Sequence, residues 1–245
     1  MMHNLHDTHF HLDLHETRAG IIKEIESNEV FTIAVTNLPP LFEKLEKEVR
    51  SKFIKVSLGF HPELISQYKK YIPAMWKLLP KTRLIGEVGI DLSAGKESRS
   101  EQVSFFEELI NRCNDYGDKV LSIHSRSAYN EVISIIGSNF NGTKILHWFS
   151  GPQKNLERAI NNGYYFSINY SMTCSEAGRK IISRIPRDRI LLESDSPFIE
   201  IDRRVFRLSD LEKIIINIAK IKGFEVDDIK RALEQNFITC YPNIF

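Results

Sequence analysis

A His-x-His pair, His9 and His11, stands near the start of the chain. Successive side chains of a β-strand point to opposite faces, so residues two apart face the same way, whereas on a helix they diverge. Two imidazoles on one face of a strand can chelate a single divalent metal ion. Alone, the pair is equally typical of solvated histidines at a polar strand end. We expect the neighbouring histidines to be surface residues: His3, His6 and His15.

A glutamate flanked by glycines is the second candidate ligand. Glu87 follows an apolar run and lies between Gly86 and Gly89. Glycines let a backbone and a ligand approach closely. A carboxylate there can bridge two metal ions, because each oxygen can bind one of them. Pairing with an arginine is an equally good interpretation of Glu87 alone.

Two further histidines, His124 and His147, end consecutive apolar runs. A lone histidine at a strand end is more often a satisfied core residue than a ligand. Two of them in consecutive strands, after the His-x-His pair and Glu87, favour a metal centre.

The last acidic motif contains Glu193 and Asp195 and ends at Pro197, where a strand must stop because proline cannot continue the ladder. We expect Asp195 to be a metal ligand and the base for an attacking water, with Glu193 facing the same side. The alternative for Asp195 is a helix N-cap, since Asp and Ser before Pro are frequent caps.

Two weaker candidates could contact a phosphate. Arg126 lies two residues beyond His124 and could form a forked contact with a phosphate. His61 is followed by Pro62 and could donate to a phosphate oxygen or act as an acid. Downstream, a local basic rim or a solvated helix face is formed by Arg203, Arg204 and Arg207.

Eight short apolar runs rich in β-branched residues must position these side chains. We expect strands at 4–9, 31–36, 55–58, 83–86, 119–123, 144–147, 164–168 and 189–192. Helical patterns occupy 17–27, 39–52, 102–113, 127–136, 155–162 and 208–221, with one extra helix at 226–242. This alternation predicts an α/β fold, a closed (β/α)8 TIM barrel forming a single domain over residues 1–245, with an open doubly wound sheet as the alternative. In such barrels the active site lies at the carboxyl ends of the strands, where all the candidates fall.

Composition narrows the functional class. The 245 residues carry a net charge of +1, which excludes a global basic field, so a polyanion would have to be attracted locally. Three widely spaced cysteines predict reduced, mostly structural thiols. No apolar run approaches the length of a membrane span, and we expect a cytoplasmic protein that makes no membrane contact. Phosphate-loop, dinucleotide and serine-hydrolase motifs are absent.

Together the motifs resemble the TatD family of metal-dependent hydrolases over almost the full chain. They stand in the family's order at 7–13 (DTHFHLD), 59–62 (GFHP), 86–91 (GEVGID), 123–126 (IHSR), 147–151 (HWFSG), 193–197 (ESDSP) and 236–237 (NF). Several stretches are similar to the QatD branch, a TatD-like component of the Qat anti-phage defence system: 32–37, 59–64, 122–126 and 145–151.

The resemblance implies a TIM barrel with metal-dependent DNase activity, often from a 3′ end. It implies a first metal at His9, His11, Glu87 and Asp195, and a second at Glu87, His124 and His147. It also implies phosphate contacts from His61 and Arg126. We therefore expect two divalent ions, Zn, Mg, Mn or Ni, and a hydrolytic mechanism.

The expected substrate is DNA, as single strands or 3′ ends, and the expected partners are other Qat defence proteins. The expected oligomeric state is a monomer. The sequence departs from the family after Pro197, where residues 199–207 replace an Arg- and Gly-rich segment. Two other functions stay open: hydrolysis of a small non-nucleic substrate by the same metals, and a largely non-catalytic role in a defence complex.

Overall fold

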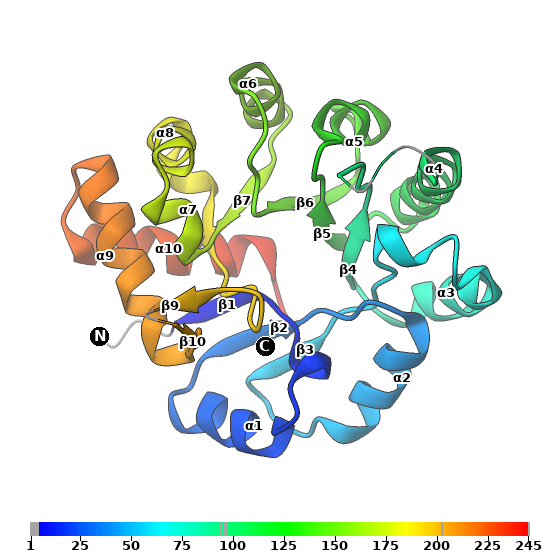
Figure 1. The fold of residues 1–245 in the computed structure, drawn as a ribbon, viewed down its shortest axis with the longest axis horizontal. Coiled ribbons are helices and arrows are strands. Elements are labelled where there is room, and N and C mark those ends of the chain that lie inside the picture. The colour runs from blue at the N-terminus through cyan, green and yellow to red at the C-terminus, as the bar shows by residue number, and fades with distance from the viewer. Residues whose placement is uncertain (1–4, 94, 96–97, 202, 245) are drawn as a thin grey trace. The chain divides into compact units, whose positions relative to one another are not determined.

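The computed structural model describes residues 5–93, 95, 98–201 and 203–244. Figure 1 shows the order of the elements along the chain. The backbone divides into two compact units, described separately below. Unit 1 comprises Met1–Ala34, Val49–Lys55 and Phe166–Phe245, and unit 2 comprises Val35–Glu48 and Val56–Tyr165. The prediction of a single domain over the whole chain stays a prediction.

Unit 1 contains two pairs of parallel strands. β1 (His6–Phe10) pairs with β2 (Phe31–Ala34), and β7 (Tyr165–Ile168) pairs with β8 (Ile190–Leu192). The Thr8 hydroxyl donates to the carbonyl of Leu192 at 2.9 Å and joins β1 to β8. The ends of β1 and β8 therefore lie side by side.

The helices of unit 1 are α1 (Arg18–Ser27), α7 (Tyr170–Cys174), α8 (Glu176–Arg184), α9 (Leu211–Lys222) and α10 (Val226–Cys240). α9 buries Leu211, Ile214, Ile215 and Ile218, the spacing of one helical face. It ends at Gly223, whose φ of 68° suits a residue without a Cβ. A short antiparallel hairpin, β9 (Glu200–Ile201) and β10 (Arg204–Val205), follows β8.

Unit 2 is built on three parallel strands in the order β4 (Leu84–Gly89), β5 (Lys119–His124) and β6 (Gly142–His147). All six residues of β4 are buried, as expected for a strand covered on both faces. β3 (Ile54–Val56) lies where the chain passes from unit 1 to unit 2.

The helices of unit 2 are α2 (Pro39–Glu48), α3 (Ile72–Leu78), α4 (Arg99–Tyr116), α5 (Tyr129–Ile136) and α6 (Gln153–Asn161). In α4, Phe105 contacts Phe60 and stacks on Trp76 of α3, with ring centroids 5.2 and 5.1 Å apart. Short 3-10 turns occur at Leu12–Leu14, Pro62–Leu64, Lys69–Tyr71, Leu79–Lys81, Arg187–Arg189 and Leu208–Asp210. Within the described residues no helix is long and apolar enough to cross a membrane.

All eight predicted strands are present within a few residues of their expected bounds. Four elements were not predicted from the sequence: α3, α7, α8 and the β9–β10 hairpin. α7 has five residues and α3 has seven, so neither completes the repeat on which a helical pattern is recognised. The interior glycine of α8, Gly178, lowers its helix propensity.

The expectation that His6 is a surface residue was wrong. His6 begins β1 and is 1% exposed. Its Nε2 accepts the N–H of Leu192 at 3.2 Å, and its ring stacks on Phe237 with centroids 4.6 Å apart. Burial lowers the pKa of His6 to about 3, so the ring is neutral. His15 is half-buried, and His3 lies outside the described residues.

Candidate metal centre

The first cluster, His9, His11 and Asp195, lies in unit 1. His9 lies in β1 and His11 directly follows it, and their Nε2 atoms are 3.3 Å apart. The Oδ1 atom of Asp195 lies 3.8 Å from Nε2 of His9 and 3.5 Å from Nε2 of His11. All three side chains are buried. The end of β1 and the segment after β8 therefore bring two imidazoles and one carboxylate to a common point.

The backbone at Asp195 aims its side chain at the histidines. Its φ is 49°, in the left-handed region that Asp tolerates better than most residues. Its N–H donates to the carbonyl of His9 at 2.9 Å, which ties the segment after β8 to β1. A turn and then β9 follow Asp195, so the helix-cap interpretation of this residue was wrong.

The buried carboxylate of Asp7 holds together the two segments that carry the first cluster. Its Oδ1 accepts the N–H of His9 at 3.2 Å and the N–H of Ser194 at 3.0 Å. Burial raises the pKa of Asp7 to about 7, against the lowering effect of the Ser194 hydrogen bonds. Asp7 holds the two segments that carry the cluster, a role that the sequence analysis missed because its partner is 187 residues away.

Glu193 is fully buried beside β7. One carboxylate oxygen accepts from the hydroxyl of Ser167, and the other accepts from Nδ2 of Asn169 at 2.9 Å. Both contacts stabilise the end of β7. A catalytic role for Glu193 stays a prediction.

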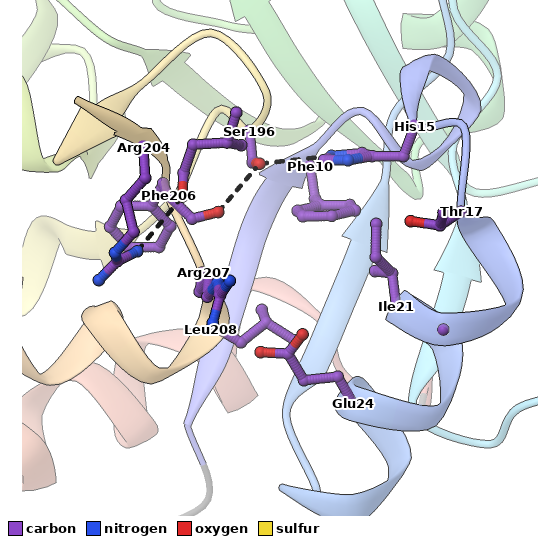
Figure 2. Close-up of a pocket in the computed structure, with 12 residues that line it drawn as sticks. Phe10, His15, Thr17, Ile21, Glu24, Ser196, Arg204, Phe206, Arg207 and Leu208 are labelled. Carbon is purple, nitrogen blue, oxygen red and sulfur yellow. Dashed lines mark hydrogen bonds between the residues drawn. The ribbon is translucent and has the colours of Figure 1, made fainter.

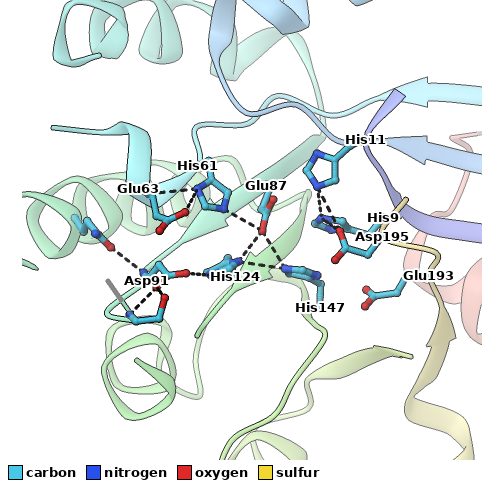
Figure 3. A network of polar contacts seen from close by, with 12 residues as sticks. His9, His11, His61, Glu63, Glu87, Asp91, His124, His147, Glu193 and Asp195 are labelled. Carbon is cyan, nitrogen blue, oxygen red and sulfur yellow. Dashed lines mark hydrogen bonds and ion pairs between the residues drawn. The ribbon is translucent and has the colours of Figure 1, made fainter. Parts of the chain in front are cut away.

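The second cluster, His61, Glu87, His124 and His147, lies in unit 2. Figure 3 shows its rings directed at Oε1 of Glu87. That oxygen is 2.7 Å from Nδ1 of His124, 3.0 Å from Nε2 of His147 and 3.6 Å from Nε2 of His61. The alternative interpretation of Glu87, pairing with an arginine, does not match these contacts. His124 and His147 reach it because each is the last residue of its strand, β5 or β6.

Asp91 orients His124 from the other side of the ring. Its Oδ2 lies 2.6 Å from Nε2 of His124. Asp91 is itself held by Ser93, whose N–H and hydroxyl donate to Oδ1 at 2.7 and 2.6 Å, and its own N–H donates to Gln102 at 2.8 Å. Burial alone would lower the pKa of His124, but the contacts with Asp91 and Glu87 raise it above its ordinary value. A proton on Nε2, facing Asp91, makes the Nδ1 lone pair available to a metal ion.

The glycines around Glu87 have a different role from the one expected. A Cβ on Gly89, whose φ is 145°, would lie 2.0 Å from the carbonyl oxygen of His124. A Cβ on Gly86 would lie 2.7 Å from the Cβ of Ser122. The glycines thus allow β4 to approach β5 closely, and that approach brings Glu87 within reach of His124.

The donor atoms of both clusters fit a divalent metal ion. The Nδ1 atom of His124 and the Nε2 atom of His147 are 3.3 Å apart, the same separation as the Nε2 atoms of His9 and His11. Two ligands that each lie about 2.0–2.1 Å from a tetrahedral ion are about 3.3–3.4 Å apart. Imidazole nitrogens with carboxylate oxygens are donors that Zn, Mn and Ni accept.

His61 and Arg126 were predicted to contact phosphate. Nδ1 of His61 accepts the N–H of Glu63 at 3.3 Å, and its other nitrogen faces Glu87. Ligand atoms of His61, Glu87 and His124 lie within 4.8 Å of one another, so His61 lies where a metal ligand can lie. The side chain of Arg126 is exposed beyond the end of β5.

Unit 1 contains a pocket of about 330 Å³, lined in part by sequence neighbours of the first cluster (Figure 2). Its wall includes Phe10 and Ser196. In the sequence, Phe10 stands between His9 and His11, and Ser196 follows Asp195. The Ser196 hydroxyl lies 3.3 Å from Nε2 of His15. It also donates to the carbonyl of Phe206 at 3.4 Å, so the pocket wall braces the segment that carries Asp195.

The arginines after Pro197 lie on and beside the β9–β10 hairpin, so their interpretation as a helix face was wrong. Arg204 forms two hydrogen bonds with the carboxylate of Asp210, at 2.7 and 2.8 Å, and is neutralised by it. The exposed cations of this segment are therefore Arg203 and Arg207.

Comparison with known proteins gives consistent results. A family model described as TatD related DNase matches residues 6–242. The chain is 25% identical to human "Deoxyribonuclease TATDN3" over 97% of this chain and 94% of that protein. It is also 25% identical to "Uncharacterized metal-dependent hydrolase MJ1582" of Methanocaldococcus jannaschii, over 96% of this chain and 94% of that protein.

Among solved structures, the TatD homologue YJJV of Escherichia coli superposes with a TM-score of 0.88 at 20% identity, covering 98% of both chains. A hydrolase TatD family protein of Entamoeba histolytica superposes with a TM-score of 0.83 at 17% identity, covering 99% of both. These similarities confirm the prediction of an α/β TIM barrel of the metal-dependent hydrolase type.

Proposed function

Because the chain belongs to the TatD family of DNases and is a metal-dependent hydrolase, we propose that it cleaves phosphodiester bonds of DNA from a 3′ end with two divalent metal ions. The observation that carries the proposal is the convergence of three imidazoles on one oxygen of Glu87, within 2.7 to 3.6 Å. Imidazoles grouped around a single buried carboxylate are typical of a metal centre rather than of a packed core.

We assign ligands to the ions from the order of the motifs. The first ion would be held by His9, His11, Glu87 and Asp195, and the second by Glu87, His124 and His147. When bound, such ions lower the pKa of a water and offset the charge that develops on phosphorus. His61 is close enough to Glu87 to act either as a further ligand or as a proton donor.

The side chains of the protein supply the base, the phosphate contact and the support of the strands. Asp195 orients the attacking water and accepts its proton, because its carboxylate faces the His9 and His11 imidazoles and is otherwise buried. Arg126 offers an exposed guanidinium fork for a non-bridging phosphate oxygen. Glu193 keeps β7 and β8 in place through Ser167 and Asn169.

Metal analysis of the purified protein tests whether Glu87 is a ligand of both ions. We expect about two ions per chain in the wild type. Glu87→Gln should lose affinity for both ions, whereas His124→Ala should lose mainly one. Glu107→Gln, an exposed glutamate of α4, is the matched control. If Glu87→Gln kept both ions at wild-type affinity, Glu87 would not bridge them.

A nuclease assay tests the substrate. Single-stranded DNA labelled at the 3′ or the 5′ end, with and without EDTA, should release the 3′ label first and only when metal is present. Simple esters and amides assayed in parallel should be poor substrates. Rapid ester or amide hydrolysis without DNA cleavage would instead favour a small-molecule hydrolase.

We also propose a biological setting. The similarity of residues 32–37, 59–64, 122–126 and 145–151 to the QatD branch supports a component of anti-phage defence that acts with other Qat proteins. We expect it to be a cytoplasmic monomer. Phage plating on cells that carry the system with Asp195→Asn should show loss of protection. Protection that survives Asp195→Asn would indicate a non-catalytic role.

A further inference from the structure

One large aromatic side chain is left in solvent beside the first cluster. Phe198 is 59% exposed, more than the other large apolar side chains of the described residues. A single exposed apolar side chain is ordinary on a protein surface. What distinguishes Phe198 is therefore its position and not its exposure alone.

The position of Phe198 is set by the candidate site. Its ring meets the ring of His11 edge to face, with centroids 5.2 Å apart and planes at 87°. Its N–H donates to the carbonyl of Asp195 at 2.9 Å, which holds the turn after Ser196. The aromatic ring is thus fixed next to one ligand of the first cluster and three residues beyond another.

We propose that Phe198 is a stacking platform for a nucleobase of a single-stranded nucleic-acid end bound at the first cluster, an inference that rests on the function proposed above. Aromatic side chains beside a nucleic-acid channel stack on bases without regard to sequence, since every base has a π face. Bases inside a duplex are already stacked on their neighbours, whereas unpaired bases at an end expose a face. Phe198 would then select single-stranded ends and position the scissile phosphate.

Binding and cleavage of two oligonucleotides test this role. One is a single strand with normal bases, and the other has base-free residues at its last two positions. In the inert Asp195→Asn background, Phe198→Ala should weaken binding of the first oligonucleotide by about 5- to 150-fold relative to the second. Phe198→Trp should restore the preference for the base-bearing strand. Ile238→Ala removes a 55% exposed apolar side chain from α10 and should leave the preference as it was.

In the enzyme with Asp195 intact, Phe198→Ala should lower kcat/KM more for the base-bearing oligonucleotide than for the other one. Most of this loss should be a rise in KM. Equal losses on both oligonucleotides, or none, would overturn the inference. Loss of bound metal in Phe198→Ala would also overturn it, because Phe198 would then act by packing His11. If the wild type cleaved neither oligonucleotide with metal present, the proposed function itself would fail, which is distinct from cleavage without base selectivity.

Discussion

Asp91 Oδ2 lies 2.6 Å from His124 Nε2, on the side of the imidazole opposite to Glu87. The two residues are 33 positions apart, and the close approach of β4 and β5 brings them together. Carboxylate partners of this kind orient a metal-binding imidazole and raise its basicity. His124 is therefore held in place before any metal binds.

Replacing Asp91 should weaken metal binding without removing a ligand. Asp91→Asn takes away the charge that holds the proton on Nε2 of His124, and we expect metal affinity to fall about 10- to 100-fold. Titration against a competing chelator measures the change. Asp115→Asn, on the exposed side of α4, is the matched control and should behave as wild type. Unchanged affinity in Asp91→Asn would show that His124 needs no such partner.

Replacing Asp195 should strongly reduce catalytic activity and leave the stability of the fold unchanged. Asn tolerates the left-handed φ of 49° at this position, so Asp195→Asn should keep a wild-type melting temperature and some metal. Loss of the base should reduce phosphodiesterase activity by about 10²- to 10⁴-fold. Steady-state rates with metal in excess provide the measurement, with the exposed Asp188→Asn as control. An Asp195→Asn enzyme with full activity would disprove the assigned role.

The ion pair between Arg204 of β10 and Asp210 of the following 3-10 turn should make the stability of the protein depend on pH in the acid range. Arg204 holds the pKa of Asp210 well below its usual range. A carboxyl whose pKa is lowered on folding stabilises the protein above its unfolded pKa, and this stabilisation is lost as pH falls below about 4.

Asp210→Asn should therefore lower the free energy of unfolding at pH 7 by about 1–3 kcal/mol. The difference from wild type should shrink at acid pH. Urea denaturation over a pH series measures both. Glu212→Gln, which breaks an exposed pair with Lys230, should cost less than about 1 kcal/mol. A pH-independent loss in Asp210→Asn would contradict the assignment.

The buried His6 should contribute a second acid-sensitive element. Its pKa is lowered to about 3 by burial, below the ordinary value of 6.5, so the unfolded chain binds a proton that the folded chain does not. This favours unfolding progressively as pH falls from about 6.5 towards 3, by up to about 1.4 kcal/mol per pH unit.

His6→Gln keeps an acceptor for the N–H of Leu192 and does not titrate. Its stability should therefore fall less steeply than that of wild type between pH 6 and 4, measured by denaturant unfolding with chelator present. His15→Gln, where the ring is only half-buried, should change the slope over a narrower pH range. Identical slopes in wild type and His6→Gln would mean that His6 is protonated in the folded protein.

The sequence by itself determined the strands and most of the candidate ligands. The His-x-His pair could be recognised without knowing its surroundings because alternation is a property of any β-strand, although His11 itself lies one residue beyond β1. His124 and His147 could be recognised because each stands at the end of an apolar run. The family match over residues 6–242 agrees with the order of these motifs.

The tertiary structure decided which side chains support those ligands. Asp7 reaches Ser194 because β1 and the end of β8 lie side by side, and Asp91 reaches His124 because β4 pairs with β5. Both contacts join segments that are distant in sequence. Periodicity reports which face a residue occupies, but it carries no information on register between strands. The burial of His6, the close approach permitted by Gly86 and Gly89, and the exposure of Phe198 depend on such long-range packing and became visible only in the folded chain.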